Sequence, residues 1–330
     1  MSKPGCCLWN LAVTLTIAAV PGALSNEAAA QSYPSRPITM IVPFPAGGPT
    51  DAIGRIVAEA MRTRLGQPVI IENAPGGAGR VAAARAVRAA PDGYTLSLGN
   101  TGTHVFNGAI HNLPFDLQRD FAPVAAMTTQ PMIIDGRNSL PAKDLRELIA
   151  WLKANADKAT QATAGPGSGS HVAGVFFQRE TGTRYQFVPY TESGMRDLIA
   201  GRIDMMIDPA ANSVPQVRAG TIKAFAIAAK KRLSAVPEIP TVEEAGLPGF
   251  HMAAWHALWV PKGTPQDVVA KLNAAVVDSL ADQAVRSRLA DLGQDIYPRD
   301  EQTPEALGAL QEAEIEKWWP IIKAAGIKVE

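Results

Sequence analysis

The segment that determines the fold is Ile38-Thr39-Met40-Ile41-Val42, followed directly by the turn Pro43-Phe44-Pro45-Ala46-Gly47-Gly48-Pro49-Thr50-Asp51. The residues before the turn are nearly all apolar and predict a buried strand. Pro49 suits the first turn of a helix, because its missing N–H would have no partner there. The pattern recurs at Val69-Ile70-Ile71, followed by Glu72-Asn73-Ala74-Pro75-Gly76-Gly77-Ala78-Gly79-Arg80. Each copy predicts a strand, a tight turn and a helix.

The segments around these turns alternate between strand and helix patterns. Apolar residues from Ile53 to Leu65 repeat with helical spacing and predict a helix over 50–65. A helix over 79–89 and a strand over 94–98 complete a βαβαβ order, which predicts a parallel sheet with right-handed crossovers. Ligands of such sheets bind beyond the carboxyl ends of the strands. We therefore expect the loops at 44–51, 73–80 and 99–104 to meet at one site.

A second unit of the same kind begins near residue 135. Its pattern predicts helices over 143–155, 171–180 and 194–200, and strands over 160–164, 185–188, 203–207 and 222–228. A strand over 252–260 and a long final helix over 304–324 follow. The chain has no low-complexity linker, so we expect two lobes joined by two crossing strands, with 124–133 and 252–260 as the candidates.

The N-terminal residues have the composition of a secretory signal. Lys3 precedes an apolar stretch from Leu8 to Leu24, and Ala28-Ala29-Ala30 offers small residues for cleavage after Ala30. A membrane anchor is the alternative, but Pro21-Gly22 interrupts a stretch shorter than the roughly 20 apolar residues of a span. The chain's two cysteines, Cys6 and Cys7, lie inside this signal. The mature chain is therefore expected to have no disulfide, thiolate nucleophile or cysteine metal site.

Several function classes are disfavoured by composition and motifs. Lys and Arg number 31, as do Asp and Glu, and no long basic run occurs, which argues against a nucleic-acid partner. No H-E-x-x-H or G-x-S-x-G motif is present. Residues 77–82 match G-x-G-x-x-A, but the acid that a dinucleotide site needs is missing at 97–100. We expect no catalytic residues, metal or cofactor.

The turns instead predict an anion site. Backbone N–H groups at a helix start attract negative charge, and in an exported protein a carboxylate is the expected anion. Arg80 either points to solvent or grips a carboxylate, and Asp208 either caps a helix or accepts a hydrogen bond from a ligand hydroxyl or a water. One helix start contributes roughly 0.3–2 kcal/mol, whereas micromolar affinity needs about 8 kcal/mol. Several turns from both lobes must therefore converge.

The chain resembles the tripartite tricarboxylate transporter receptors, also called Bug-type periplasmic solute-binding proteins. The resemblance covers 31–330, and its most specific elements are Tyr33-Pro34-Ser35-Arg36-Pro37-Ile38, Pro43–Asp51, Asn73-Ala74-Pro75-Gly76, Pro91-Asp92-Gly93-Tyr94-Thr95-Leu96, Asp120-Phe121-Ala122-Pro123-Val124 and Gly246-Leu247-Pro248-Gly249-Phe250. It implies an α/β fold of the type II, or Venus-flytrap, class. The expected organisation is a signal peptide at 1–30, lobe 1 at 31–130 and 254–330, and lobe 2 at 131–253.

The resemblance also implies a monomeric periplasmic receptor that captures a small mono- or dicarboxylate for a membrane permease. The alternatives are a receptor that serves a sensor kinase and an exported enzyme on the same fold. From the residues and the resemblance together, the expected ligand-binding residues are Phe44, Pro45, Ala46, Gly47, Gly48, Thr50, Asp51, Arg80, Asn100, Thr101, Ser168, His171, Tyr190 and Asp208. The sequence departs from the family pattern in two places. Arg80 stands where the family has a small polar residue and would add a carboxylate clamp, and the shortened segment 191–194 after Tyr190 predicts altered specificity. The identity of the carboxylate stays open.

Overall fold

The computed structural model describes residues 33–190, 194–233 and 235–327. The chain divides into two units, residues 1–32 and 33–330, and the description below concerns the second. The predicted signal segment lies outside the described residues. Among the described helices, none is both long and apolar enough to cross a membrane.

A first sheet section is built around β1, which lies between β2 and β3 and is parallel to both, as the βαβαβ pattern predicts. Strand β9 continues the section in the antiparallel direction, pairing with β3 on one side and β4 on the other. The short strand β10 also pairs with β4. The bounds are β1 (Ile38–Val42), β2 (Val69–Asn73), β3 (Thr95–Asn100), β4 (Phe121–Arg137), β9 (Ala253–Pro261) and β10 (Asp295–Ile296).

A second sheet section uses the other half of β4. From Met132 onward, β4 pairs with β7 and β8, both antiparallel to it. Strand β5 lies between β7 and β6 and is parallel to both. The bounds are β5 (Thr160–Thr163), β6 (Gln186–Pro189), β7 (Met205–Pro209) and β8 (Ile222–Ile227).

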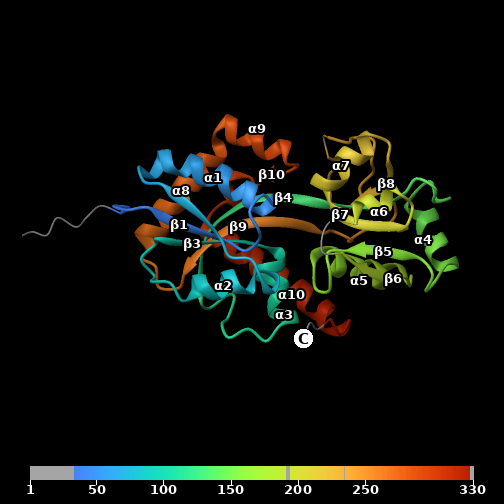
Figure 1. Cartoon of the computed structure of the whole chain (residues 1–330), viewed down its shortest axis with the longest axis horizontal. Coiled ribbons are helices and arrows are strands. Elements are labelled where there is room, and N and C mark those ends of the chain that lie inside the picture. Colours follow the sequence, from blue (N-terminus) through green and yellow to red (C-terminus); the bar gives the residue numbers. More distant parts are fainter. Residues whose placement is uncertain (1–32, 191–193, 234, 328–330) are drawn as a thin grey trace, which may run out of the picture. The chain divides into compact units, whose positions relative to one another are not determined.

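The two sections share β4, which runs through both of them (Figure 1). They meet at Met132 and Met252. Strand β4 pairs with β9 up to Pro131 and with the second section beyond it. The N–H of Met132 donates to the Met252 carbonyl at 3.0 Å, and the N–H of Met252 donates to the Ala228 carbonyl at 3.0 Å. Residue 252 leads directly into β9. Both chain passages between the sections therefore lie side by side, one in β4 and one just before β9.

Helices cover both faces of the first section (Figure 1). In β1, Met40 and Val42 pack into a buried cluster with α1 and α8, whereas Ile41, which lies between them in the sequence, packs into the cluster on the opposite face. This alternation is the side-chain period of a strand covered on both sides. The helices of the first section are α1 (Pro49–Leu65), α2 (Arg80–Val87), α3 (Asn107–Ile110), α8 (Gln266–Ala281), α9 (Gln283–Asp291) and α10 (Pro304–Ala324), with the shorter turns η1 (Gly77–Gly79), η2 (Gly102–Phe106) and η3 (Arg299–Glu301).

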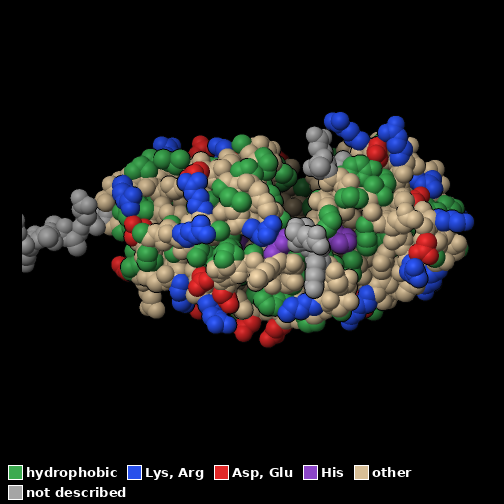
Figure 2. Space-filling model, turned by 60° about the horizontal axis from the view of Figure 1, so that its bottom comes forward, with side chains coloured by type: hydrophobic (Ala, Val, Ile, Leu, Met, Phe, Trp, Pro, Cys, Tyr) green, Lys and Arg blue, Asp and Glu red, His purple; other side chains and the backbone are tan. Residues whose placement is uncertain are grey.

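The second section is covered by shorter helices. Their positions agree with the predicted helices at 143–155, 171–180 and 194–200 to within a few residues. The bounds are α4 (Leu145–Ala154), α5 (Gly169–Thr181), α6 (Met195–Ile199) and α7 (Ala210–Arg218). Basic and acidic side chains are both scattered over the face shown in Figure 2. Many form exposed ion pairs, such as Arg36 with Asp92 at 3.0 Å, and pairs of this kind add little stability.

The loop expected at 99–104 is not a loop. Strand β3 extends through Asn100, and the π-helical turn η2 begins at Gly102. The Asn100 N–H donates to the Thr103 hydroxyl at 2.9 Å, and the Thr103 N–H donates to Asn100 Oδ1 at 3.0 Å. These reciprocal bonds satisfy the backbone groups at the junction, so the chain passes from strand to helix with Thr101 alone between them.

Candidate ligand-binding site

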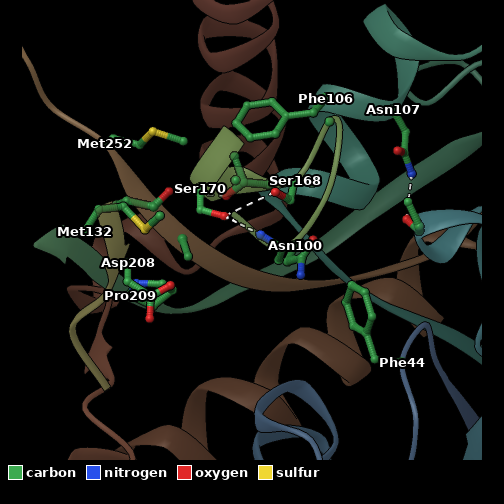
Figure 3. Close-up of a pocket in the computed structure, with 18 of the residues that line it drawn as sticks. Phe44, Asn100, Phe106, Asn107, Met132, Ser168, Ser170, Asp208, Pro209 and Met252 are labelled. Atoms are coloured by element: carbon green, nitrogen blue, oxygen red, sulfur yellow. Dashed lines mark hydrogen bonds between the residues drawn. The ribbon is translucent and has the colours of Figure 1, made fainter. Parts of the chain in front are cut away.

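A cavity of about 390 Å³ lies where the two sheet sections join. Its wall comes from both sections and from the joining residues Met132 and Met252 (Figure 3). The wall residues are Phe44, Ala78, Asn100, Thr101, Gly102, Phe106, Asn107, Met132, Ala164, Pro166, Gly167, Ser168, Gly169, Ser170, Asp208, Pro209, Asn212, Met252, Ala253 and Ala254. At about 30 Å³ per water molecule, the cavity has the volume of roughly thirteen water molecules, which is room for a small organic molecule.

Two helices of the second section begin at this cavity. Helix α5 starts at Gly169 after its N-cap Ser168, and α7 starts at Ala210 after Pro209. The Ser168 hydroxyl accepts from the His171 N–H at 3.3 Å and lies 3.2 Å from the Ser170 hydroxyl, as Figure 3 shows. The N-terminus of a helix carries a partial positive charge and unpaired N–H groups. The two helix starts therefore favour negative charge in the cavity.

The charged side chain of the described wall is Asp208. It is the next-to-last residue of β7 and is 8 % exposed, and its carboxylate accepts from Asn212 Nδ2 at 2.9 Å. Burial raises the pKa of Asp208 to about 6, although the Asn212 bond acts in the opposite direction. Among the described residues, no Lys, Arg or His lines the wall. An anion bound here is held by N–H groups, hydroxyls and amides, next to an acid that titrates near neutral pH.

The first turn contributes Phe44 to the wall, while its other predicted residues brace the turn or lie outside the wall. The Gly47 N–H donates to Asp51 Oδ2 at 2.8 Å, and the Gly48 N–H donates to the Pro45 carbonyl at 3.3 Å. Asp51 also accepts from Asn73 Nδ2 and Arg55 Nε, both at 2.8 Å. Burial opposes ionisation of this carboxyl, but its hydrogen bonds from Arg55, Gly47 and Asn73 lower the pKa of Asp51 to about 2. Asp51 is thus an ionised brace for the turn.

The first helix of this turn still offers unpaired amides. Ala52 is the first residue whose N–H bonds within the helix, to the Gly48 carbonyl at 3.0 Å. The N–H groups of Thr50 and Asp51 precede it and have no intrahelical acceptor. The Thr50 and Asp51 amides therefore stay candidate donors to an anion, whereas the Gly47 and Gly48 N–H groups are bonded within the turn.

The second turn supplies Ala78, which has a positive φ of 54°. Its carbonyl accepts from Asn107 Nδ2 at 2.9 Å, a bond visible in Figure 3. At Gly79, a Cβ atom would lie 2.4 Å from Thr103 Cγ2 and 3.1 Å from Pro43 Cβ. Glycine is required there because the turns after β1, β2 and β3 meet at this point.

Five of the predicted site residues line the cavity wall, namely Phe44, Asn100, Thr101, Ser168 and Asp208. Pro45, Ala46, Gly47, Gly48, Thr50 and Asp51 belong to the first turn but lie outside the wall. Their contact with a ligand, like that of the remaining residues, stays a prediction.

Arg80, His171 and Tyr190 also lie outside the wall, and each has a protein partner. Arg80 Nε donates to the Gly77 carbonyl of its own turn at 2.9 Å. His171 Nδ1 accepts from the Gly167 N–H at 3.0 Å, and burial lowers its pKa. The Tyr190 hydroxyl donates to Asp197 at 2.8 Å. The shortened segment after Tyr190 includes residues 191–193, which lie outside the described residues.

The wall also contains residues that the sequence analysis missed. The polar ones are Asn107, Ser170 and Asn212, and the large apolar ones are Phe106, Met132 and Met252. Asn212 had a signal, because it follows Asp208 by one helical turn at the start of α7. Met132 and Met252 had none, since apolar residues within strands are ordinarily core residues.

The described residues contain no group of three or more His, Cys, Asp or Glu placed to hold a metal ion. Separately, the described cavity wall offers neutral hydrogen-bonding groups, two helix N-termini and the Asp208 carboxyl.

The chain is similar to several solved structures. The chain is similar to the solved structure of MatC (Rpa3494) from Rhodopseudomonas palustris with bound malate, at 40% identity and a TM-score of 0.78, covering 88% of this chain and 100% of that one. It is similar to periplasmic binding protein BugD, at 36% identity and a TM-score of 0.78, covering 90% and 100%. It is also similar to R. palustris Rpa4515 with adipate, at 31% identity and a TM-score of 0.79, covering 90% and 100%.

The fold is thus the mixed α/β fold of periplasmic binding proteins, as the sequence predicts. The family model described as "Tripartite tricarboxylate transporter family receptor" matches residues 53–327. The chain belongs to the tripartite tricarboxylate transporter receptor family.

Proposed function

We propose that this protein is a periplasmic receptor that captures a small dicarboxylate in the cavity between its sheet sections and delivers it to a membrane permease. The observation that carries the proposal is that the N-termini of α5 and α7 converge on one cavity. The described wall of this cavity contains no cationic side chain, so an anion there would be held by the helix N-termini and by neutral hydrogen-bond donors. Each helix start contributes roughly 0.3–2 kcal/mol toward an anion, and each hydrogen bond to a charged group about 1.5–3 kcal/mol. Two helix starts and a few such bonds reach the roughly 8 kcal/mol of micromolar binding.

Asp208 narrows the ligand class further. A carboxylate placed beside the ionised Asp208 would be repelled, whereas a hydroxyl or ammonium group would donate a hydrogen bond to it. We therefore infer that the ligand carries a proton-donating group beside its acidic groups, as a hydroxy dicarboxylate does. The bound malate of MatC is such an acid, and the adipate of Rpa4515 lacks a hydroxyl.

The experiment is titration calorimetry with malate, succinate and adipate at pH 7.5 and pH 5. We expect malate to bind at least tenfold more tightly than succinate at pH 7.5. At pH 5, protonated Asp208 no longer repels a carboxylate, so the advantage of malate should shrink. Asp208→Asn should reduce that advantage at pH 7.5, whereas Asp295→Asn, an acid whose pKa burial also raises but which lies outside the wall, should not.

Two outcomes contradict different parts of the proposal. If none of the three acids binds, the receptor function is wrong for this ligand class. If malate binds but its advantage survives Asp208→Asn unchanged, the donor requirement is wrong and the carboxylate receptor stands.

The residues of the wall support a receptor rather than an enzyme. Ser168 and Ser170 are bonded to each other at 3.2 Å, and Ser170 also accepts from the Ala164 N–H at 3.0 Å. In the described wall neither serine faces a histidine or lysine that would act as a base. Ligand recovered after prolonged incubation should be chemically unchanged by NMR. Export is tested separately, since the mature protein should begin at Gln31 by mass spectrometry.

A further inference from the structure

A buried histidine of β9, His256, lies behind the first turn and outside the cavity wall. It is 3 % exposed, and its strand register places it opposite Asn100 of β3 and Thr128 of β4. Its side chain reaches the beginning of α1, where Nε2 lies 3.1 Å from the Thr50 hydroxyl. His256 thus connects the strand that returns from the second section with the helix start of the first turn.

The hydrogen bonds around His256 determine which ring nitrogen carries the proton. Burial lowers the pKa of His256 to about 4, so the ring is neutral at pH 7, with one donor and one acceptor nitrogen. The Thr128 hydroxyl gives its proton to Gln294 Oε1 at 2.9 Å and lies 3.4 Å from His256 Nδ1. The Thr128 oxygen, whose proton goes to Gln294, is left as an acceptor toward Nδ1, and we therefore assign the ring proton to Nδ1. Nε2 then accepts, and the Thr50 hydroxyl donates its proton to it.

The Thr50–His256 hydrogen bond determines which polar groups of Thr50 remain for a ligand. Thr50 is buried, and its hydroxyl proton points inward to His256 rather than toward a ligand. Its backbone N–H, at the second position of α1, is one of the amides left unpaired for an anion. Asp51 braces the turn toward Asn73 and Gly47, and His256 braces the helix start toward β9.

Strand β9 also holds Thr101, which lies between β3 and the start of η2. The Thr101 hydroxyl lies 3.4 Å from the Ala253 carbonyl and accepts from the Trp255 N–H at 3.2 Å. Thr101 and Ala253 both line the cavity. Bonds to threonine hydroxyls therefore hold the helix starts after β1 and β3 to successive residues of β9.

We propose that His256 is a positioning residue that holds the start of α1 against β9, and with it Phe44 of the cavity wall and the Thr50 and Asp51 amides that we expect to bind the anion. The inference rests on the proposed carboxylate-binding function and adds a residue that raises affinity without touching the ligand. Misplacement of an anion site by a fraction of an ångström weakens several hydrogen bonds together. Removing the His256–Thr50 bond should therefore weaken binding more than the loss of one buried hydrogen bond lowers stability.

The test compares two variants, each of which places a side-chain amide near the position of one of the two imidazole nitrogens. In His256→Gln, the side-chain amide reaches the place of Nε2 and can accept from Thr50. In His256→Asn, the shorter amide keeps the place of Nδ1 near Thr128 and Gln294 and cannot reach Thr50. With L-malate as the probe, we expect His256→Asn to lose about tenfold or more in affinity and His256→Gln to stay within about threefold of the wild type.

Variants of Thr50 examine the same bond from the other side. Thr50→Val should lose affinity like His256→Asn, and Thr50→Ser should retain it. The double variant Thr50→Val/His256→Asn should be no weaker than either single change, because both remove one interaction. Thr264→Val is the control, since Thr264 is a buried threonine outside the wall whose hydroxyl donates to Pro261 at 2.8 Å. It should change stability without changing affinity.

Wild-type affinity in His256→Asn, equal losses in the Gln and Asn variants, or additive losses in the double variant would each overturn the positioning role. Hydrogen exchange of the 44–51 backbone without ligand separates this inference from the proposed function. If the wild type binds no carboxylate, the proposed function fails. Faster exchange of this turn in His256→Asn and Thr50→Val, but not in His256→Gln, still supports the brace, and unchanged exchange rejects it.

Discussion

At the scale of single residues, the cavity wall contains a buried carboxyl group, that of Asp208, whose burial lowers the stability of the fold when it is ionised. Asp208 is buried beside Asn212, and burial raises its pKa to about 6, so at pH 7 it is ionised at a cost in stability. A second acid, Asp135, lies fully buried nearby, where burial raises its pKa and its carboxylate accepts from Ser213. Local energetic conflicts of this kind mark functional sites. Asp208 faces the cavity, and Asp135 does not.

Asp208→Asn should stabilise the free protein in a pH-dependent way. The folded pKa of about 6 lies above the ordinary 3.8, so the folded state binds more protons than the unfolded state between about pH 4 and 6. Stability from Asp208 is full below pH 4 and is lost as the pH rises through 6. The variant should match the wild type near pH 4 and exceed it by about 2–3 kcal/mol above pH 7. Urea unfolding across this range is the measurement, and a difference independent of pH would contradict it.

At the scale of elements, helix starts determine what the cavity can bind. Ser168 is both the N-cap of α5 and a wall residue, so its hydroxyl serves the helix and faces the ligand site. Thr303 caps α10 in the same way, accepting from the Ala306 N–H at 3.1 Å, but lies outside the cavity wall. Comparing variants of Ser168 and Thr303 therefore distinguishes the effect of a cap on helix stability from its effect on ligand binding.

Ser168→Asp should retain stability and lose binding. Aspartate caps a helix as well as serine does, so the free energy of unfolding should change by less than about 1 kcal/mol. Its negative charge faces the anion, so malate affinity should fall at least tenfold. Thr303→Asp, the matched control, should retain both. Unfolding curves and calorimetry measure the two effects, and unchanged malate affinity in Ser168→Asp would remove α5 from the anion site.

Gly79→Ala should be costly at the junction of the three turns. The added Cβ would meet Thr103 Cγ2 at 2.4 Å in a backbone with φ +88°, whereas at Gly182, with φ +63°, it meets nothing within 4 Å. Gly182→Ala therefore reports backbone strain alone, about 1–2 kcal/mol. Gly79→Ala adds a clash worth about 1–3 kcal/mol, and by moving Thr103 it displaces Asn100 of the wall. Equal stability losses in the two variants would show that the close contact of the turns at Gly79 adds no steric cost.

At the scale of the whole described unit, the cavity lies where two chain passages run side by side. Met132 and Met252 are bonded to each other and line the cavity. Helix α10 spans the join as well. Its Trp318 packs edge-on against Phe106 of the first section and Phe176 of the second, at 5.6 Å and 5.2 Å between ring centroids. A ligand in the cavity therefore contacts residues of both sections at their junction.

Malate at saturation should protect both sections from hydrogen exchange together. The wall segments 100–102, 168–170 and 208–212 should slow in parallel, because one ligand orders all of them. At a hundredfold excess over Kd, the same ligand should raise the free energy of unfolding by about 2.7 kcal/mol. Mass-spectrometric exchange with and without malate is the measurement. Protection confined to one section would contradict a shared site.

The sequence by itself determined the family and the order of the main strands and helices, but not η2, α3, α9 or β10. Strand and helix periods are local, and the turns at 43–51 and 73–80 carry their glycines and prolines in a readable order. From the loops after the strands and from the family resemblance, it also predicted Phe44, Asn100, Thr101, Ser168 and Asp208 as ligand-binding residues, and these five line the cavity.

Only the tertiary structure decided which of those groups are free for a ligand. Asp51, Thr50 and Arg80 have side chains suited to an anion site, yet each is bonded to a protein partner that is remote in sequence or folded back onto its own turn. Met132, Met252 and Asn107 enter the wall from segments far apart in the chain. Hydrogen-bond partners and cavity walls depend on distances between such segments, and local sequence patterns do not specify those distances.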